Sequence, residues 1–282
     1  PNFATLGNAT NILGQFGPLA LLALGQMCVI LIRGYDISVG AVMAIASVVA
    51  AMAIGIFGIA GVLAAPVVGA IFGCLNGVLV GRLKVQPVVA TLGTRLLARS
   101  LALIVSDGGQ AVVVDGDAQM QLMDFNFGSL AGVPYGAILT AIVFLAVAWA
   151  LRTRRAGRRL FMVGGDPDAA RLVGVSIERT TVLAYAMCGV CAGLAAALIL
   201  ARTGAGLPTD GFGMELQAIA TAVIGGTPLT GGFANPVGVF IAALIIQTIY
   251  SGLSFSAISP YAGECILGVV ILIAGVMGRW RH

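Results

Sequence analysis

Long apolar segments alternate with short polar breaks along almost the whole chain. Most of these segments hold 17 to 22 residues, which is the length an α-helix needs to cross the hydrocarbon layer of a membrane, about 30 Å thick. The pattern therefore predicts an all-α integral membrane protein with about nine spans. The segments are 16–32, 41–57, 59–80, 88–105, 135–151, 181–201, 216–224, 235–252 and 261–277.

Two stretches differ from this pattern. Residues 216–224 form a segment of only about nine apolar positions, so it is either extended by residues 212–215 or re-entrant. Residues 1–15 are polar and contain no long apolar run, so we expect them to form a loop at a membrane surface.

The basic residues indicate how the chain is oriented. Residues 152–179 hold seven of the fifteen Lys and Arg residues, whereas residues 106–133 hold none and include four Asp residues. Because positively charged loops are retained in the cytoplasm during insertion, we expect 152–179 to be a cytoplasmic loop and 106–133 to lie on the outer side of the membrane. Alternation then places Arg33 and residues 82–84 inside and residues 1–15 outside, which implies a missing first helix.

A short helix is expected at the centre of the basic loop, over residues 167–173. Asp166 is a good N-cap, Pro167 suits the first helical position, and Gly174 can end the helix. A short capped helix on the cytoplasmic face is suited to be a docking surface for a partner protein inside the cell.

The composition agrees with a single membrane domain over residues 1–282. The chain is 59% hydrophobic and 9% charged, with a mean hydropathy of +1.05. Soluble domains carry about 25% charged residues, and the much lower charged fraction of this chain indicates an integral membrane protein. Its net charge of +4 does not predict nucleic-acid binding, because the basic residues lie at expected inner membrane edges.

Several kinds of chemistry are excluded by residue types. The single Lys, Lys84, follows Leu83, so the chain lacks a Gly-Lys-Ser/Thr phosphate loop, and the GGTPLTGG run at 225–232 reads as a tight turn between helices. The single His, His282, excludes a histidine-based triad and a histidine-rich metal site. We expect no catalytic residue and no metal site in this chain.

Charged residues within apolar segments are costly and need a reason. Arg95 and Arg99 lie on one helix face, where they either snorkel to a headgroup layer or line a water-filled interior. Asp36, Glu215 and Glu264 are candidates for a proton or sodium relay. They lie at segment ends, however, which favours helix capping or hydrogen bonds between helices.

Small residues predict one close helix crossing. Gly69, Gly73, Gly77 and Gly81 are spaced by four, so they line one helix face on which a neighbouring helix can pack tightly. The CxxC pair at 188–191 lies in an apolar segment without a surrounding βαβ pattern and is expected to be packing.

Four ordered motifs carry a family resemblance. They are GYDISVG at 34–40, ATLGT at 90–94, the glycine-containing run over 157–175, and GMELQAIA with VIGGTPLTGG over 213–232. Together they resemble the permeases of bacterial ABC importers for monosaccharides, the branch for ribose, galactose, xylose and autoinducer. The resemblance covers nearly the whole chain. Departures at Asp166, Gln217 and Pro228 weaken any inference about the sugar.

The resemblance implies a fold and a set of partners. The fold is the multi-span helical permease of the vitamin B12-importer-like type. Two permease chains pair, two ABC ATPase subunits dock on the cytoplasmic side, and a periplasmic sugar-binding protein delivers the monosaccharide. ATP and Mg are bound by the ATPase, so this chain needs no cofactor of its own. The location is the bacterial inner membrane, where lipid surrounds the spans.

The resemblance also implies roles for individual residues. Residues 167–173 match the coupling helix that sits in a cleft of the ATPase, and the coupling positions are Gly164, Gly165, Asp166, Pro167, Ala169, Ala170, Arg171 and Gly174. The motif positions with a structural role around the pore are Gly34, Asp36, Ser38, Gly40, Thr91, Gly93, Thr94, Glu215, Gly225, Gly226, Gly231 and Gly232.

We place the sugar pathway near segments 41–57, 88–105 and 216–232, because they hold side chains able to bond sugar hydroxyls. The candidates are Ser47, Asn76, Thr91, Thr94 and Thr221.

Two other classes of transport protein are alternatives. A secondary transporter would work alone on a sodium or proton gradient, and the lack of buried, paired carboxylates counts against it. A passive channel is the other, and the glycine-rich, non-repeating spans argue against it. Neither class needs a handle for an ATPase, so the capped helix in the basic loop favours the importer.

Overall fold

The computed structural model describes residues 3–255 and 268–269, and helices dominate this part of the chain. The helices are α1 (Leu6–Gln15), α2 (Gly17–Leu31), α3 (Val39–Phe57), the 3₁₀ turn η1 (Gly58–Leu63), α4 (Ala64–Gly81), α5 (Pro87–Val105), α6 (Gly116–Phe127), α7 (Tyr135–Thr153), α8 (Arg155–Gly165), α9 (Pro167–Leu172), α10 (Ile177–Thr203), α11 (Met214–Ile224) and α12 (Pro236–Phe255). Two short ribbons pair β1 (Val112–Val113) with β4 (Ala205–Gly206), and β2 (Ser129–Leu130) with β3 (Val133–Pro134), both antiparallel.

Helix α2 is the centre of the bundle. All of its residues are buried, and it contacts α10, α11, α12, α7 and α8. A helix that is apolar on every side is stable only when other apolar surfaces enclose it, so the even hydrophobicity of this segment matches its central place.

The glycine stripe of α4 is the face that packs on α10, as predicted. A Cβ atom at Gly69 would overlap the backbone of Gly189, and one at Gly73 would overlap the carbonyl of Tyr185. Gly77 is as close to the backbone of Val182. Because only glycine leaves room for this approach, the spacing of four specifies the contact.

The part of the chain that the structure describes supports fewer spans than the nine expected. Within residues 3–255 and 268–269, five helical runs are long and apolar enough to cross a membrane, or six if α1 and α2, bent by 44°, form one span. One of the five is Val39–Gly81, which contains α3, η1 and α4. Helix α11 has 11 residues and is about 16 Å long, which is about half the thickness of the hydrocarbon layer of a membrane. The span expected at 261–277, with Glu264, lies outside the described residues except for positions 268–269.

The prediction of a loop over residues 1–15 was wrong. Residues Leu6–Gln15 form α1, and the Thr5 side chain accepts a hydrogen bond from the Asn8 backbone at 3.2 Å. Asn8 is buried, and Ser251 of α12 donates to its side-chain oxygen at 3.0 Å. Helix α1 is stabilised by its N-cap and by contacts with the distant helix α12. Its polar sequence did not indicate a helix.

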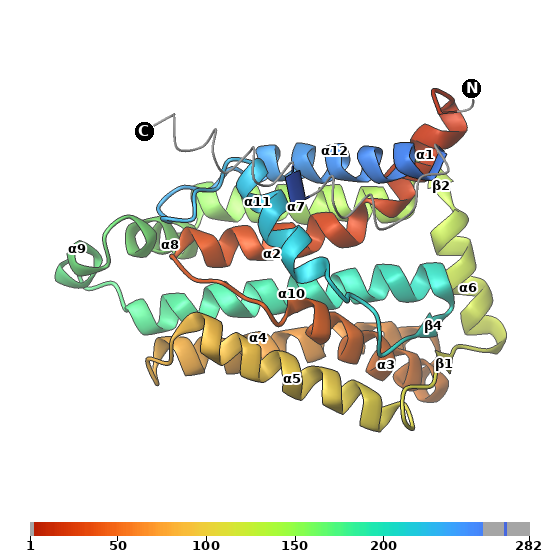
Figure 1. The fold of residues 1–282 in the computed structure, drawn as a ribbon, viewed down its shortest axis with the longest axis horizontal. Coiled ribbons are helices and arrows are strands. Elements are labelled where there is room, and N and C mark those ends of the chain that lie inside the picture. The colour runs from red at the N-terminus through yellow and green to blue at the C-terminus, as the bar shows by residue number, and fades with distance from the viewer. Residues whose placement is uncertain (1–2, 256–267, 270–282) are drawn as a thin grey trace.

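Figure 1 shows the long helices running lengthwise, with α9 at one end and α6 at the other. The α9 end holds the basic stretch 152–179, and the α6 end holds the acidic stretch 106–133. The β1–β4 ribbon joins 106–133 to the segment after α10, so two segments expected on the same side of the membrane do lie together.

Candidate functional site

Helix α9 is the short capped helix that the sequence predicted, ending one residue earlier. The Asp166 side chain accepts hydrogen bonds from the backbone nitrogens of Asp168 and Ala169, at 2.9 and 3.0 Å. Gly174 has φ 78°, the left-handed conformation that ends a helix. Leu172 is 89% exposed. A capped helix that carries an exposed leucine at the end of the bundle is a surface suited to a protein partner.

Helix α8, which the sequence did not predict, holds α9 to the bundle. Its apolar face is buried through Leu160 and Val163, while its arginines face outward. A Cβ at Gly157 would overlap the backbone at Leu151, so α7 and α8 meet in a close elbow. The stretch 152–179 is therefore two ordered helices rather than a loop around one.

The GYDISVG motif forms a buried segment that turns back into the bundle after α2. Gln26 of α2 donates to the Asp36 carbonyl, and Tyr185 of α10 donates to the Tyr35 carbonyl at 3.0 Å. Gln26 lies five residues before the end of α2 and Tyr185 eight residues after the start of α10. At 1.5 Å per residue, the motif penetrates about 10 Å from the α9 end.

The polar side chains of this motif bond to one another and to two neighbouring helices. The Ser38 hydroxyl donates to Asp36 Oδ1 at 2.6 Å, and Asn76 Nδ2 donates to the Ser38 oxygen at 2.8 Å. Thr94 donates to Asn76 Oδ1 at 2.7 Å. The network links the motif, α4 and α5, and its members are all buried.

A second interrupted segment approaches from the α6 end, over residues 204–213. Gly40, at the start of α3, is packed so closely that a Cβ there would overlap the Gly211 carbonyl and lie 2.5 Å from Glu215 Oε2. Ser47 of α3 donates to Asp210 Oδ2 at 2.8 Å. Helices α3 and α11 thus both begin inside the bundle, where two breaks in the helical chain meet. Transporters commonly place substrate and ion sites at such interrupted helices.

The two arginines of α5 both bond to residues that precede or begin α11. Arg95 forms an ion pair with Glu215 at 2.7 Å, and Arg99 donates to the carbonyls of Pro208 and Asp210, the latter at 3.0 Å. The Glu215 side chain is 4% exposed and that of Arg95 is 34% exposed. Both arginines therefore hold α5 against the segment that leads into α11.

The five sugar-pathway candidates are buried, and each donates a hydrogen bond to another group of the chain. Ser47, Asn76 and Thr94 belong to the networks above. Thr91 donates to the Pro87 carbonyl at 2.8 Å and Thr221 to that of Gln217 at 2.6 Å. Their contact with a sugar stays a prediction. Sequence reasoning missed Gln26, although a lone amide in an apolar span was a signal for an interior contact.

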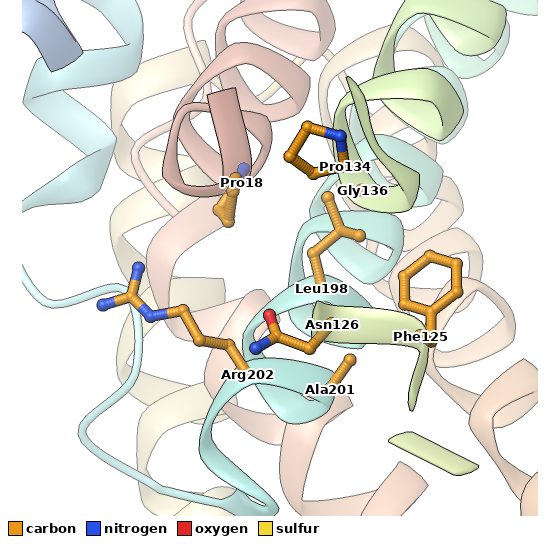
Figure 2. A pocket seen from close by; sticks show the side chains of 9 residues that line it. Pro18, Phe125, Asn126, Pro134, Gly136, Leu198, Ala201 and Arg202 are labelled. Atoms are coloured by element: carbon orange, nitrogen blue, oxygen red, sulfur yellow. The ribbon is translucent and has the colours of Figure 1, made fainter. Parts of the chain in front are cut away.

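Two cavities in the described part of the chain do not suit a sugar. The one in Figure 2, lined by residues of α1, α2, α6, α7 and α10, has a volume of about 10 Å³, enough for about one water molecule. The other, about 220 Å³, lies between α7 and α12 and is lined by Ala, Phe, Leu, Pro and Val side chains, which offer sugar hydroxyls no bond.

A family model described as the branched-chain amino acid transport system/permease component matches residues 8–275. The chain belongs to this permease family. The ribose import permease RbsC of Escherichia coli K12 is 37% identical over 97% of this chain and 86% of its own length. The D-allose permease AlsC of the same strain is 34% identical over 98% and 85%. The galactose/methyl galactoside permease MglC is 30% identical over 100% and 89%. No solved structure matches the chain.

These relatives confirm the resemblance to the ribose and galactose branch of sugar permeases. The chain is thus a multi-pass permease of the inner membrane and a transport protein of the ABC type. The names of the relatives describe transport subunits rather than enzymes.

Proposed function

We propose that this permease forms half of the pore of an ATP-driven importer that passes a monosaccharide from a periplasmic binding protein into the cytoplasm. The relatives are named for ribose import, D-allose transport and galactose/methyl galactoside import, which supports a monosaccharide as the substrate class. The proposal includes the vitamin B12-importer-like arrangement with about nine spans, in which α3 and α4 count separately and residues 261–277 supply another.

Helix α9 carries the proposal. Its exposed Leu172 and Val173 lie at the end of a capped helix beyond the bundle, and Ala170 anchors it on its buried side. Such a surface would be covered by an ATPase subunit that binds ATP and Mg. Gly164, Gly165, Asp166, Pro167, Ala169, Ala170, Arg171 and Gly174 are the proposed coupling positions, with Asp166 and Gly174 defining the two ends.

A second permease chain completes the proposed pathway. The two described cavities of a single chain do not suit a sugar, whereas α5 and α11 leave Leu96 and Leu216 largely exposed beside the Arg95–Glu215 pair. If the pore forms between two permease chains, the Arg95–Glu215 pair would lie next to the passing sugar, and no closed pocket within one chain would be needed. The partner chain is either identical or a close relative.

Transport then follows from two states of the assembly. ATP binding closes the ATPase dimer, and α9 of each permease converts this movement into rocking of the helices around the pathway. One state admits the sugar from the binding protein at the α6 end, and hydrolysis returns the pore to the state open at the α9 end.

Co-purification with candidate ATPase subunits from detergent tests the proposal. The intact chain is compared with the double variant Arg171→Glu plus Gly174→Pro, which reverses a charge on α9 and places proline where φ is 78°. We expect the ATPase to be retained by the intact chain and lost from the variant. If no ATPase binds to folded intact protein, the proposal of an ATP-driven importer is wrong, and a gradient-driven secondary transporter becomes the leading hypothesis.

A further inference from the structure

Three segments far apart in the sequence meet at the α9 end, around Arg33. Arg33 Nε donates to the Gly164 carbonyl at 2.8 Å, and its Nη2 donates to the Gly165 carbonyl. The backbone nitrogen of Gly232 donates to the Leu31 carbonyl at 2.9 Å. The end of α8, the end of α2 and the loop 225–232 are thereby bonded together, and we name this contact the Arg33 junction.

The chemistry of the Arg33 junction suits an arginine. Gly164 and Gly165 are the last residues of α8, where carbonyls lack helical partners and the helix dipole is negative. The planar guanidinium can bond two such carbonyls at once, which a lysine ammonium on its flexible stem does less well.

The segments of the Arg33 junction lie in close contact, although the Arg33 side chain itself is exposed. A Cβ at Gly164 would overlap the Leu31 carbonyl, and one at Gly231 would lie 2.5 Å from Arg33 Cγ. Segments in such close contact have no free space between them to absorb a displacement. Movement of one segment therefore moves the other two or breaks the bonds between them.

The Arg33 junction lies between the two functional regions of the chain. On one side, Gly165 immediately precedes the Asp166 cap of α9. On the other side, Arg33 leads directly into the buried motif 34–38. The Tyr35 hydroxyl also donates to the Leu229 carbonyl at 3.3 Å, so the start of this motif contacts the same loop.

We propose that Arg33 is a positioning residue that ties α9 to the buried motif 34–38 and to the loop 225–232, so that a push on α9 reaches the interior of the bundle. The inference rests on the proposed function, since it assigns the transmission of the ATPase movement. An arginine that only caps α8 would stabilise the fold and leave the sugar carried per ATP unchanged.

The test uses proteoliposomes that hold the permease, its ATPase subunits and the binding protein. Uptake of labelled D-ribose, or of D-allose or D-galactose if the unmodified chain carries that sugar instead, is divided by the ATP hydrolysed. Only the ATP hydrolysis that the binding protein stimulates is counted, because ATPase subunits can hydrolyse ATP without a folded permease. A misfolded permease then lowers both uptake and stimulated hydrolysis, so their ratio reports coupling. The variants are Arg33→Gln, which loses both the positive charge and the planar guanidinium group, and Arg33→Lys, which loses the guanidinium group but keeps the charge.

Arg158→Gln is the matched control. It removes one basic residue from the same end of the bundle together with an arginine-to-carbonyl bond, the 2.9 Å bond to Thr153, but it does not touch the Arg33 junction. We expect sugar per ATP to fall about fivefold or more in Arg33→Gln and to a smaller extent in Arg33→Lys. Arg158→Gln should keep the ratio of the unmodified chain.

An unchanged ratio in Arg33→Gln overturns the inference while the proposed function stands. If Arg33→Gln does not fold, Arg33→Lys decides, and an unchanged ratio in that variant overturns it equally. If the unmodified chain binds no ATPase or carries no sugar, the proposed function itself fails, and the inference that depends on it fails too.

Discussion

Asp36 and Glu215 show how single carboxylates are used inside this bundle. Asp36 accepts bonds from the Ser38 hydroxyl and backbone, at 2.6 and 2.9 Å, and Glu215 pairs with Arg95. A buried charge is tolerated when partners compensate its desolvation. Each carboxylate has such partners. This favours a structural role, in which the carboxylates hold the helix breaks together, rather than a role in a proton or sodium relay.

The Arg95–Glu215 ion pair is predicted to stabilise the fold. We expect Arg95→Gln and Glu215→Gln each to lower the free energy of unfolding by about 1–3 kcal/mol, because each leaves a charge without its partner. In a double-mutant cycle measured by thermal unfolding in detergent, the two losses should not add, since they share one interaction.

The exposed pair Lys84–Glu178 is the control for that cycle. Its atoms are 3.9 Å apart and its side chains are 60% and 53% exposed, so water screens the interaction. The cycle of Lys84→Gln with Glu178→Gln should give a coupling energy near zero. Equal coupling in the two cycles would contradict the assignment of the Arg95–Glu215 pair.

Two neighbouring glycines at the end of α8, Gly164 and Gly165, should differ sharply in their tolerance of alanine. Alanine at Gly164 would overlap the Leu31 carbonyl, whereas alanine at Gly165 would meet no atom within 4 Å. We expect Gly164→Ala to cost about 1–3 kcal/mol of unfolding free energy and Gly165→Ala less than about 0.5 kcal/mol. Thermal unfolding of both variants measures the difference, and equal losses would show that α8 does not pack on α2 as described.

Local signals predicted single residues well, and long-range pairings poorly. The cap at Asp166 and the left-handed Gly174 follow from residue types next to each other in the sequence. The partner of Arg95 does not, because Glu215 lies on a helix 120 residues later and no local pattern connects them. The two uses weighed for this arginine, snorkelling or lining a wet interior, both omitted the pairing that the structure has.

At the scale of elements, the apolar pattern located most helices but not every one. The α4 stripe predicted its own packing face, since small residues spaced by four have few other uses in lipid. Helices α1, α6 and α8 were read as loops, because their sequences are polar or basic and their stability depends on contacts at the two ends of the bundle. The buried return of residues 34–38 also left no signal in hydropathy.

The contact between α4 and α10 is predicted to tolerate little added volume. Gly73→Ala would force a methyl group against the Tyr185 carbonyl, while Gly55→Ala, on α3, would meet nothing within 4 Å. We expect Gly73→Ala to lower the melting temperature by several degrees and Gly55→Ala to leave it unchanged or raise it. A melting temperature unaffected by Gly73→Ala would contradict the close crossing of the two helices.

At the scale of the whole molecule, the sequence predicted orientation by its charges and function class by its ordered motifs. The two ends of the bundle hold the acidic and basic stretches separately, as alternation of the spans requires. The sugar could not be predicted. Neither of the two described cavities suits a monosaccharide, and the departures at Asp166, Gln217 and Pro228 weaken any inference about the sugar.

The central claim is that ATP hydrolysis by the partner ATPase subunits, which act on the permease through α9, powers import of the sugar. Uptake of labelled D-ribose, D-allose and D-galactose into proteoliposomes tests it most directly, with ATPase subunits and binding protein present and ion gradients collapsed by ionophores. The account predicts uptake of one of these sugars that requires ATP and the binding protein and persists without a gradient. Uptake that follows a sodium or proton gradient and needs no ATPase would contradict it.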